Sequence, residues 1–521
     1  MRSNTQTVAK NFAWSGFEVI VAIVATLLTT VATARVIGPQ RLGYFNFIYW
    51  MTIMSGSLGS FGIDMMTFKY MGEFLGDGKP HLARSVFTNS LKIQTLISLF
   101  LAAAGEVLVF TVGNPGYRLI SGFLVLAIVP QMVAYIPSQA NAAAENLRAN
   151  TRGSLVGMSV NVVSVVLSLA LGWDLLGIAV GVFLYRTAEL AAKLVPVLDW
   201  ARAFPLVVLP PEIRKRMFTF SGRSMGLMLL QILVFDRSDI IFLKFLQSDI
   251  KQIAFFSISF SLAERLLLLP QAFARALGAT QNAQYGRDRN RLFRMTGLAA
   301  TYMILSCLPM LLGAACLSGP LVRILYGAQY LPAISVFALV AIFAIPKSIL
   351  APAQTLLYAT EDLGFLLKWG STCAAVNIVF DLLLIPNHGA YGAAVANGMA
   401  QTLAAVGIWW RAISRFDLGL QVHVIMKVVA ASLLMATIVL LVISRPLPIT
   451  VKAIAGVLTG IVAFLISLRL ISALQEEDRQ RLISAGSSIP GGLKPWYNRI
   501  VNFVVPGAAS IDTEMPQSPS S

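Results

Sequence analysis

Long apolar segments recur along almost the whole sequence and limit the folds that this chain can adopt. Runs of about 18 or more mainly apolar residues follow one another from residue 11 to residue 472, and each could cross the ~30 Å hydrocarbon layer of a bilayer as a helix. Barrel strands need only about 9–11 residues for the same crossing. Of all residues, 57% are hydrophobic and 12% are charged, about half the charged share of an average soluble protein. The sequence therefore predicts an all-α polytopic membrane protein.

About fourteen transmembrane helices are predicted. The first ends in Ala32-Thr33-Ala34, which resembles a signal-peptidase site. Its apolar region is too long for a signal peptide and contains Glu18, so we expect it to be retained. The predicted spans are residues 11–34, 44–66, 88–111, 119–141, 155–172, 175–197, 220–242, 253–274, 296–316, 331–357, 365–386, 390–412, 423–443 and 449–472.

Basic residues are distributed unevenly around these spans. There are 40 Lys and Arg residues against 24 Asp and Glu residues. Most of the basic residues lie in the loops, and at the adjoining helix ends, on the same side of the membrane as the N-terminus. The positive-inside rule then places both termini in the cytoplasm. This topology, together with contact with anionic lipid, accounts for the excess of basic over acidic residues. We therefore expect no nucleic-acid partner.

Two parts of the sequence align at a nearly constant offset of about 215 residues. Residues 137–163 align with residues 352–379, and GIAVG at 177–181 aligns with GAAVA at 392–396. The offset covers six predicted helices, an even number, so the two repeats share one orientation in the membrane. Parallel repeats of this kind occur in transporters that move two bundles around a central site. The identical residues in the first alignment include Pro137 and Pro352, Glu145 and Glu361, and Asn161 and Asn377.

The repeat defines the predicted domain organisation. Two six-helix bundles are followed by a helix pair and a tail, which contains an interfacial segment at 495–505 and a Ser/Pro-rich, disordered end. The predicted units are an N-terminal six-helix bundle over residues 1–197, a cytoplasmic linker over 198–219, a C-terminal six-helix bundle over 220–412, helices 13 and 14 within 423–472, and a cytoplasmic tail over 473–521.

Polar side chains recur at helical spacing on the first, second and eighth predicted spans. Such stripes on spans from both halves predict a shared hydrated cavity. The alternative is that the hydroxyl groups bond neighbouring helices to one another. The stripes consist of Asn11, Ser15, Glu18, Thr26, Thr29 and Thr33; Ser57, Ser60, Asp64 and Thr67; and Ser257, Ser261, Glu264 and Arg265.

Basic residues inside the spans indicate a binding site more specifically than the polar stripes do. Arg186, Arg265 and Lys347 lie within predicted helices, and each costs about 2.5–3.5 kcal/mol at the bilayer centre unless it is paired or hydrated. Cations that line a cavity suit an anionic ligand, phosphate above all, so we predict these three as substrate-binding residues. Fixed ion pairs with neighbouring carboxylates such as Glu189 remain an alternative, as does snorkelling for Lys347.

A further charged cluster lies in the segment FDRSDIIF, in the outer third of the seventh predicted span. Asp236 and Asp239 are one helical turn apart, with Arg237 between them. Water and local pairing near the interface would lower the cost of these charges. Two interpretations stay open: a structural lock at the bundle interface, or a role in gating or ion coupling.

No catalytic constellation is visible in the sequence. It contains no GxxxxGK[ST] or HExxH motif. It also offers no GxSxG or paired-carboxylate pattern that could belong to a soluble catalytic domain, because its predicted loops are too short for one. Cys307, Cys316 and Cys373 lie inside predicted spans without metal-ligand spacing. We therefore expect a transporter rather than an enzyme, with no metal and no cofactor.

Four segments resemble one known family in their order and spacing. The family comprises the polysaccharide-type flippases of the multidrug/oligosaccharidyl-lipid/polysaccharide exporter superfamily. The segments are ARVIGPQRLGYFNF (34–47), DRSD followed by AFFSISFSLAE (254–264), LVRILYGAQYLPAISVFALVAI (321–342) and IPNHGAYGAAVANGMAQT (385–402).

The resemblance implies a fold and a function. The fold would be two six-helix bundles around a V-shaped cavity. The function would be translocation of undecaprenyl-pyrophosphate-linked oligosaccharides across the bacterial inner membrane, for O-antigen, capsule or exopolysaccharide synthesis. Family members use cationic cavity residues, which Arg265 and Arg186 match best by position. A polysaccharide polymerase and a chain-length regulator are the implied protein partners.

Two other branches of the superfamily remain as alternatives. Lipid II flippases also have fourteen spans, but they place Arg residues in the first span, where this chain has Glu18. Multidrug and toxin extrusion transporters have twelve spans and bind cations through cavity carboxylates. Glu18, Asp64 and Asp381 are the candidate carboxylates here.

Overall fold

The computed structural model describes residues 21, 23–235, 238–285, 289–360, 362–485 and 494–505. Every regular element within these ranges is a helix, which confirms the predicted all-α class. Nine helical segments of the described chain are long and apolar enough to span a membrane, and Ile23–Ile37 forms a shorter apolar helix. The total of fourteen spans stays a prediction. The nine segments are Pro80–Thr111, Pro115–Ala143, Leu147–Ala170, Asp174–Arg202, Leu292–Cys316, Ala333–Tyr358, Gly364–Arg415, Val422–Ile443 and Ile449–Leu470.

The N-terminal half contains the Ile23–Ile37 helix and the elements up to α8. Several of them begin at proline, whose missing N–H is tolerated in the first helical turn. They are α2 (Pro39–Leu58), α3 (Ile63–Gly76), α4 (Pro80–Thr111), the short 3₁₀ helix η1 (Pro115–Tyr117), α5 (Arg118–Leu126), α6 (Ile128–Ala143), α7 (Leu147–Ala170) and α8 (Asp174–Arg202).

The C-terminal half begins nine residues after α8, so the segment predicted as a linker is largely helical. The elements are α9 (Pro211–Phe235), α10 (Asp239–Leu246), α11 (Lys251–Tyr285), α12 (Arg289–Cys316), α13 (Ser318–Tyr326), η2 (Ala328–Tyr330), α14 (Ala333–Ser348), α15 (Leu350–Ala359) and α16 (Leu363–Arg415). The helix pair α17 (Val422–Ile443) and α18 (Ile449–Leu470) follows, and the short helices α19 (Glu476–Ala485) and α20 (Lys494–Val504) complete the described chain.

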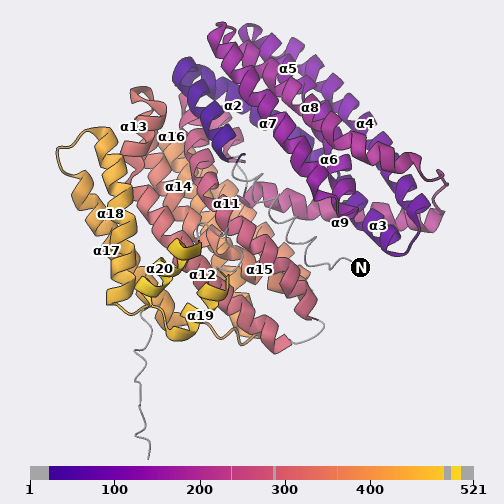
Figure 1. The fold of residues 1–521 in the computed structure, drawn as a ribbon. Coiled ribbons are helices and arrows are strands. Elements are labelled where there is room, and N and C mark those ends of the chain that lie inside the picture. The colour runs from indigo at the N-terminus through magenta and orange to yellow at the C-terminus, as the bar shows by residue number, and fades with distance from the viewer. Residues whose placement is uncertain are drawn as a thin grey trace, which may run out of the picture.

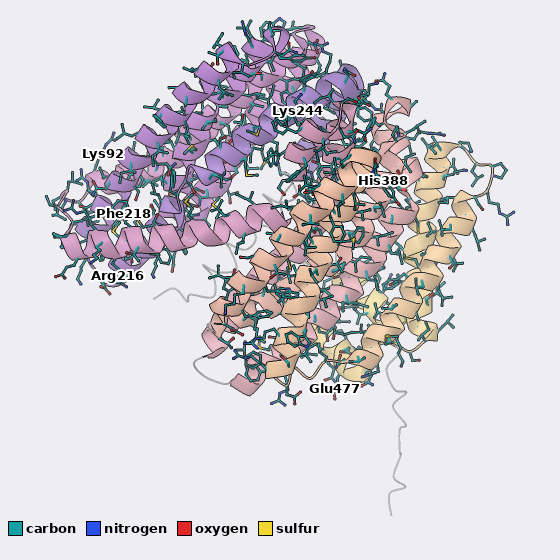
Figure 2. The ribbon with its side chains drawn as sticks, turned by 180° about the vertical axis from the view of Figure 1, so that it is seen from behind. Lys92, Arg216, Phe218, Lys244, His388 and Glu477 are labelled. Atoms are coloured by element: carbon teal, nitrogen blue, oxygen red, sulfur yellow. The ribbon has the colours of Figure 1, made fainter. Side chains whose placement is uncertain are left out.

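The two halves form a V. They meet near α2, α13 and the upper part of α16, and they diverge toward α3 on one side and α15 on the other (Figure 1). We call the meeting point the closed end and the opposite side the open end. Helix α9 runs between the halves: Arg216 near its start pairs with Glu73 of α3, and the helix also packs against α16 (Figure 2).

The second predicted span is interrupted, which corrects the continuous helix expected over residues 44–66. Helix α2 ends at Leu58 and α3 starts at Ile63, because Phe61 and Gly62 adopt positive φ angles of 48° and 71°. Side chains of other helices satisfy the freed carbonyl groups: Gln94 donates to the Gly59 carbonyl at 3.2 Å, and Ser221 donates to the Phe61 carbonyl at 2.6 Å.

Helix α16 contains the predicted eleventh and twelfth spans. Gly389, with φ 54° and ψ −129°, separates two helical parts, as the sequence predicted by dividing residues 365–386 from 390–412. Gln252 of α11 accepts a hydrogen bond from the Ala390 amide at 3.0 Å. Gln247 donates to the carbonyl of Pro386 at 2.9 Å. Side-chain amides thus replace the missing intrahelical bonds at this bend.

Backbone contacts join the halves at the closed end. Arg35 donates through Nε to the Leu325 carbonyl at the end of α13, at 2.8 Å, and the Tyr330 hydroxyl donates to the Ala34 carbonyl at 2.9 Å. Gly43 of α2 lies against the carbonyl of Ile250, so closely that a Cβ at this position would be 2.2 Å from that oxygen. Only glycine permits this approach.

A charged cluster fixes the start of α16 at the open end. Asp362 accepts hydrogen bonds from Arg411 at 2.7 Å and from Arg415 at 2.9 Å. The hydrogen bond from Arg411 and the charges of both guanidinium groups hold the pKa of the Asp362 carboxyl below its usual range. The cluster ties the loop after α15 to the far end of α16.

Replacing Gly43 by valine is expected to loosen the closed end, because the new side chain would meet the backbone of Ile250. Spin labels at the exposed residues Leu119 of α5 and Phe245 of α10 should then report longer electron–electron distances. The matched control is Gly72→Val in α3, where a Cβ would meet no atom within 4 Å. Equal distance distributions in the two variants would contradict the role of the Gly43–Ile250 contact in holding the closed end together.

Candidate functional site

A cavity of about 410 Å³ lies between the two halves. Its walls come from the Ile23–Ile37 helix, α2, α7, α8, α9 and α11. Apolar side chains such as Trp50, Val182 and Ile232 alternate with polar ones. The polar lining consists of Thr26, Thr29, Thr30, Thr33, Asn46, Tyr49, Ser57, Asn161, Ser257, Ser261, Glu264 and Arg265.

This lining contains much of the polar pattern seen in the sequence. The threonines of the first span, Ser57 of the second and the whole stripe of the eighth meet in one space. Ser60, Asp64 and Thr67 do not line it, because the break after α2 redirects the chain. Ser60 is buried, Thr67 bonds the Ile63 carbonyl of its own helix, and Asp64 lies in the first turn of α3. Asn11, Ser15 and Glu18 lie outside the described residues.

Arg265 is the basic side chain among the described residues that line the cavity, and Glu264 is the acidic one. Both are half-buried and project from the middle of α11. A guanidinium at this position presents a planar, permanently charged donor group to the space between the halves. The hydroxyl and amide groups around it can both donate and accept hydrogen bonds.

Arg186 is instead part of a buried ion-pair cluster in α8. It donates to Glu189 at 3.2 Å, and Lys193 binds the other oxygen of the same carboxylate at 2.7 Å. The Arg186 guanidinium also stacks on the Tyr185 ring at 4.5 Å. Glu189 and Lys193 are 9% and 8% exposed. The geometry matches the ion-pair alternative stated from the sequence, and Arg186 does not belong to the described cavity lining.

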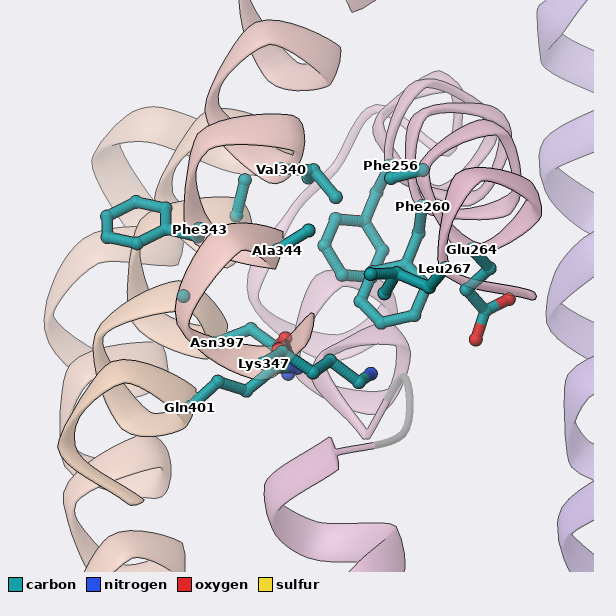
Figure 3. Close-up of a pocket in the computed structure, with 13 residues that line it drawn as sticks. Phe256, Phe260, Glu264, Leu267, Val340, Phe343, Ala344, Lys347, Asn397 and Gln401 are labelled. Carbon is teal, nitrogen blue, oxygen red and sulfur yellow. Dashed lines mark hydrogen bonds between the residues drawn. The ribbon is translucent and has the colours of Figure 1, made fainter. Parts of the chain in front are cut away.

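Lys347 of α14 lies in a smaller pocket within the C-terminal half (Figure 3). Its ammonium is 5.3 Å from the centroid of the Phe260 ring. Asn397 and Gln401 of α16 line the same pocket, as does Glu264. Lys347 therefore faces the interior of one bundle in this state, whereas Arg265 faces the space between the bundles.

Asp239 lies at the centre of a buried polar network, while Asp236 and Arg237 lie outside the described residues. Asp239 and Asp381 are fully buried and neighbour each other. Asn397 donates to Asp239 at 3.0 Å, and Asn377 donates to Asp381 at 3.2 Å. Two adjacent buried carboxyls cannot both be ionised without a neutralising cation, so this network is a candidate ion site.

Sequence reasoning named Asp381 as a candidate carboxylate of the cation-export alternative, but it did not select Asn377, Asn397 or the cavity residue Asn161 as site residues. The sequence nevertheless contains a pattern that could have identified these residues. Asn161 and Asn377 are equivalent in the internal repeat, and Asn377 and Asp381 are four residues apart on one helix, as are Asn397 and Gln401. Polar pairs at this spacing inside an apolar span mark one buried face.

The sequence matches the family of polysaccharide biosynthesis proteins over residues 32–335, more than half of the chain. The chain belongs to this family. A related protein is the succinoglycan biosynthesis transport protein ExoT of Rhizobium meliloti (strain 1021). It is 23% identical over 380 residues, which cover 72% of this chain and 73% of that protein.

Solved structures of two transporter types share the fold. The lipid II flippase MurJ in an inward closed conformation aligns with a TM-score of 0.69 at 16% identity, covering 88% of this chain and 98% of that chain. An inward-facing multidrug resistance MATE family transporter of the MOP superfamily aligns with a TM-score of 0.62 at 14% identity, covering 75% and 94%. This chain is accordingly a multi-pass membrane transporter of the polysaccharide biosynthesis family.

The substitution Glu189→Gln should destabilise the protein strongly, because it leaves Arg186 and Lys193 without the carboxylate that they share. Removing one partner of a buried ion pair costs about 3–5 kcal/mol. Thermal unfolding of the purified variant measures the loss.

Asp199→Asn is the matched control for this substitution. It breaks the Arg202–Asp199 pair on the same helix, whose side chains are 76% and 64% exposed, and it should cost about 1 kcal/mol or less. Equal unfolding temperatures for the two variants would rule out the structural role of the Glu189 cluster.

Proposed function

We propose that this transporter flips undecaprenyl-pyrophosphate-linked oligosaccharide repeat units from the cytoplasmic to the periplasmic leaflet. It would act in the bacterial inner membrane, with both termini in the cytoplasm, and supply a surface polysaccharide. The mechanism is alternating access: the cavity loads the headgroup at the open end, the polyprenyl tail stays in lipid, and rocking of the halves opens the closed end.

The central cavity is the observation that carries this proposal. An oligosaccharide pyrophosphate needs a cation for its phosphates and many bidirectional hydrogen-bonding groups for its hydroxyls. Arg265 supplies the cation, and Ser257, Ser261, Asn161 and the threonine stripe supply the rest. We keep Arg186 and Lys347 as further pyrophosphate-binding candidates for other states of the cycle, since neither lines the described cavity here.

The relative named above supports a polysaccharide substrate, because it is named for succinoglycan transport. The structural likeness to MurJ keeps the lipid II flippase as the alternative substrate class, and the likeness to MATE transporters keeps cation export. A polysaccharide polymerase and a chain-length regulator are the protein partners that we propose.

The membrane potential favours this direction of transport. Moving a headgroup of charge −2 out of an inside-negative cell gains roughly 4.6 kcal/mol at 100 mV, twice the single-charge value. Bound nucleotide is therefore unnecessary in principle. We further propose that the Asp239–Asp381 pair binds the coupling ion, a proton or Na⁺.

Charge reversal at the cavity tests the substrate proposal. Arg265→Glu places a second carboxylate beside Glu264 and should repel the pyrophosphate, which reduces surface polysaccharide at least about tenfold in a complemented deletion strain. The control is Arg445→Glu, the same charge change on the exposed loop after α17, which should leave polysaccharide production at the wild-type level. Wild-type levels of surface polysaccharide in the Arg265→Glu strain, at equal protein abundance, would refute the role of Arg265 in binding the pyrophosphate.

Ion coupling has its own test in proteoliposomes loaded with an undecaprenyl-pyrophosphate-linked monosaccharide. A proton or Na⁺ gradient should stimulate translocation by the wild type. Asp381→Asn removes one carboxyl of the buried pair, so its translocation should not respond to either gradient while gradient-free exchange persists. A full gradient response in this variant would eliminate the carboxyl pair as the ion site.

A further inference from the structure

A water-sized pocket lies inside the C-terminal half, between the carboxyl pair and the central cavity. Helices α11, α14 and α16 enclose about 20 Å³, enough space for one water molecule. Most of its wall is apolar, formed by residues such as Phe256, Phe260 and Val340. Four polar side chains also line it, namely Glu264, Lys347, Asn397 and Gln401 (Figure 3).

The inner wall of the pocket is connected to the carboxyl pair by a chain of two amides. Gln401 donates to the Asn397 oxygen at 2.6 Å, and Asn397 donates to Asp239 at 3.0 Å. Gln401 and Asn397 are each 3% exposed, and Asp239 is fully buried. The chain has a direction, because both amides donate toward Asp239, and Asn397 accepts from Gln401 through its oxygen.

The outer wall of the pocket is shared with the central cavity. Glu264 lines both spaces, and its neighbour in sequence, Arg265, lines the cavity where we place the pyrophosphate. Lys347, on the opposite side of the pocket, holds its ammonium against the Phe260 ring. The wall of this small pocket therefore contains an acidic and a basic side chain.

The direction of the amide chain depends on the state of Asp239. An ionised Asp239 accepts from Asn397, which leaves the Gln401 oxygen as the acceptor at the pocket end. A neutral group at this position can donate to the Asn397 oxygen. Both amides then reverse, and Gln401 presents N–H groups to the pocket. The first arrangement attracts the Lys347 ammonium and the second attracts the Glu264 carboxylate.

We propose that Gln401, Lys347 and Glu264 form a coupling route that links neutralisation of the carboxyl pair to anion binding at Arg265. The proposal rests on the proposed function and adds the physical connection between its two sites. Gln401 and Lys347 are positioning residues on this route. Glu264 transmits the change, because it is the side chain that borders both the pocket and the cavity.

A double-mutant cycle on the purified full-length protein tests this route. The probe is farnesyl pyrophosphate, and the measurement is its Kd by calorimetry. Asp239→Asn imitates the neutral state and should change the Kd at least about fivefold. In the Gln401→Leu background the same substitution should change the Kd less than about twofold, because the amide chain is cut. Lys347→Met should reduce the coupling in the same way.

Thr402→Val provides the matched background. Thr402 neighbours Gln401, bonds the Gly398 carbonyl of its own helix at 2.7 Å and does not line the pocket, so Asp239→Asn should keep its full effect there. Asp381→Asn serves as the neutral variant if Asp239→Asn does not fold. An undiminished effect in the Gln401→Leu background overturns the route.

Two further outcomes distinguish the route from the proposed function. Pyrophosphate binding that weakens in Arg265→Gln but does not respond to Asp239→Asn or Asp381→Asn overturns the coupling and leaves the substrate site standing. Absence of farnesyl pyrophosphate binding by the wild-type protein counts against the pyrophosphate site itself.

Discussion

The lack of water inside a bilayer is the constraint on which this architecture depends, because every backbone group there needs a partner within the protein. Continuous helices meet this condition by themselves, but the two main bends of this fold do not. At each bend the freed groups are bound by polar side chains of neighbouring helices, Gln94 and Ser221 at one and Gln252 and Gln247 at the other. The bends are thus stable features of the fold, and the first of them ends α2, which lines the cavity.

The two repeats have diverged in chemistry while keeping a common plan. Asn161 in the first half faces the cavity, whereas its equivalent, Asn377, binds the buried Asp381. Val182 also lines the cavity, and the corresponding position in the second half is Asn397, which binds Asp239. One half therefore contributes mainly surface to the cavity, and the other also contains the charged network. In the mechanism proposed above, this asymmetry would place the ion site in one half and most of the cavity surface in the other.

The sequence predicted the elements that depend on local pattern. Apolar run length located the nine segments of the described chain that are long and apolar enough to span a membrane, and helical spacing of Ser257, Ser261 and Arg265 located one wall of the cavity. It did not predict the break after Leu58, because Gly59 and Gly62 are also tolerated within membrane helices. Nor did it predict that Asp239 meets Asn397, since that contact joins helices 158 residues apart in the chain. Contacts between distant helices depend on packing, which periodicity does not encode.

Helix α9 has a mechanical consequence for the transport cycle. It is attached at its start to the N-terminal half through Arg216 and Glu73, and it packs along α16 in the other half. This ion pair is not the sole attachment to the N-terminal half, because Ser221 of α9 donates to the Phe61 carbonyl and Met217 is buried in the core that α9 shares with α3 and α4. Buried packing therefore holds α9 to both halves. A change in the angle between the halves would have to be absorbed within this one helix, by bending or by sliding along α16.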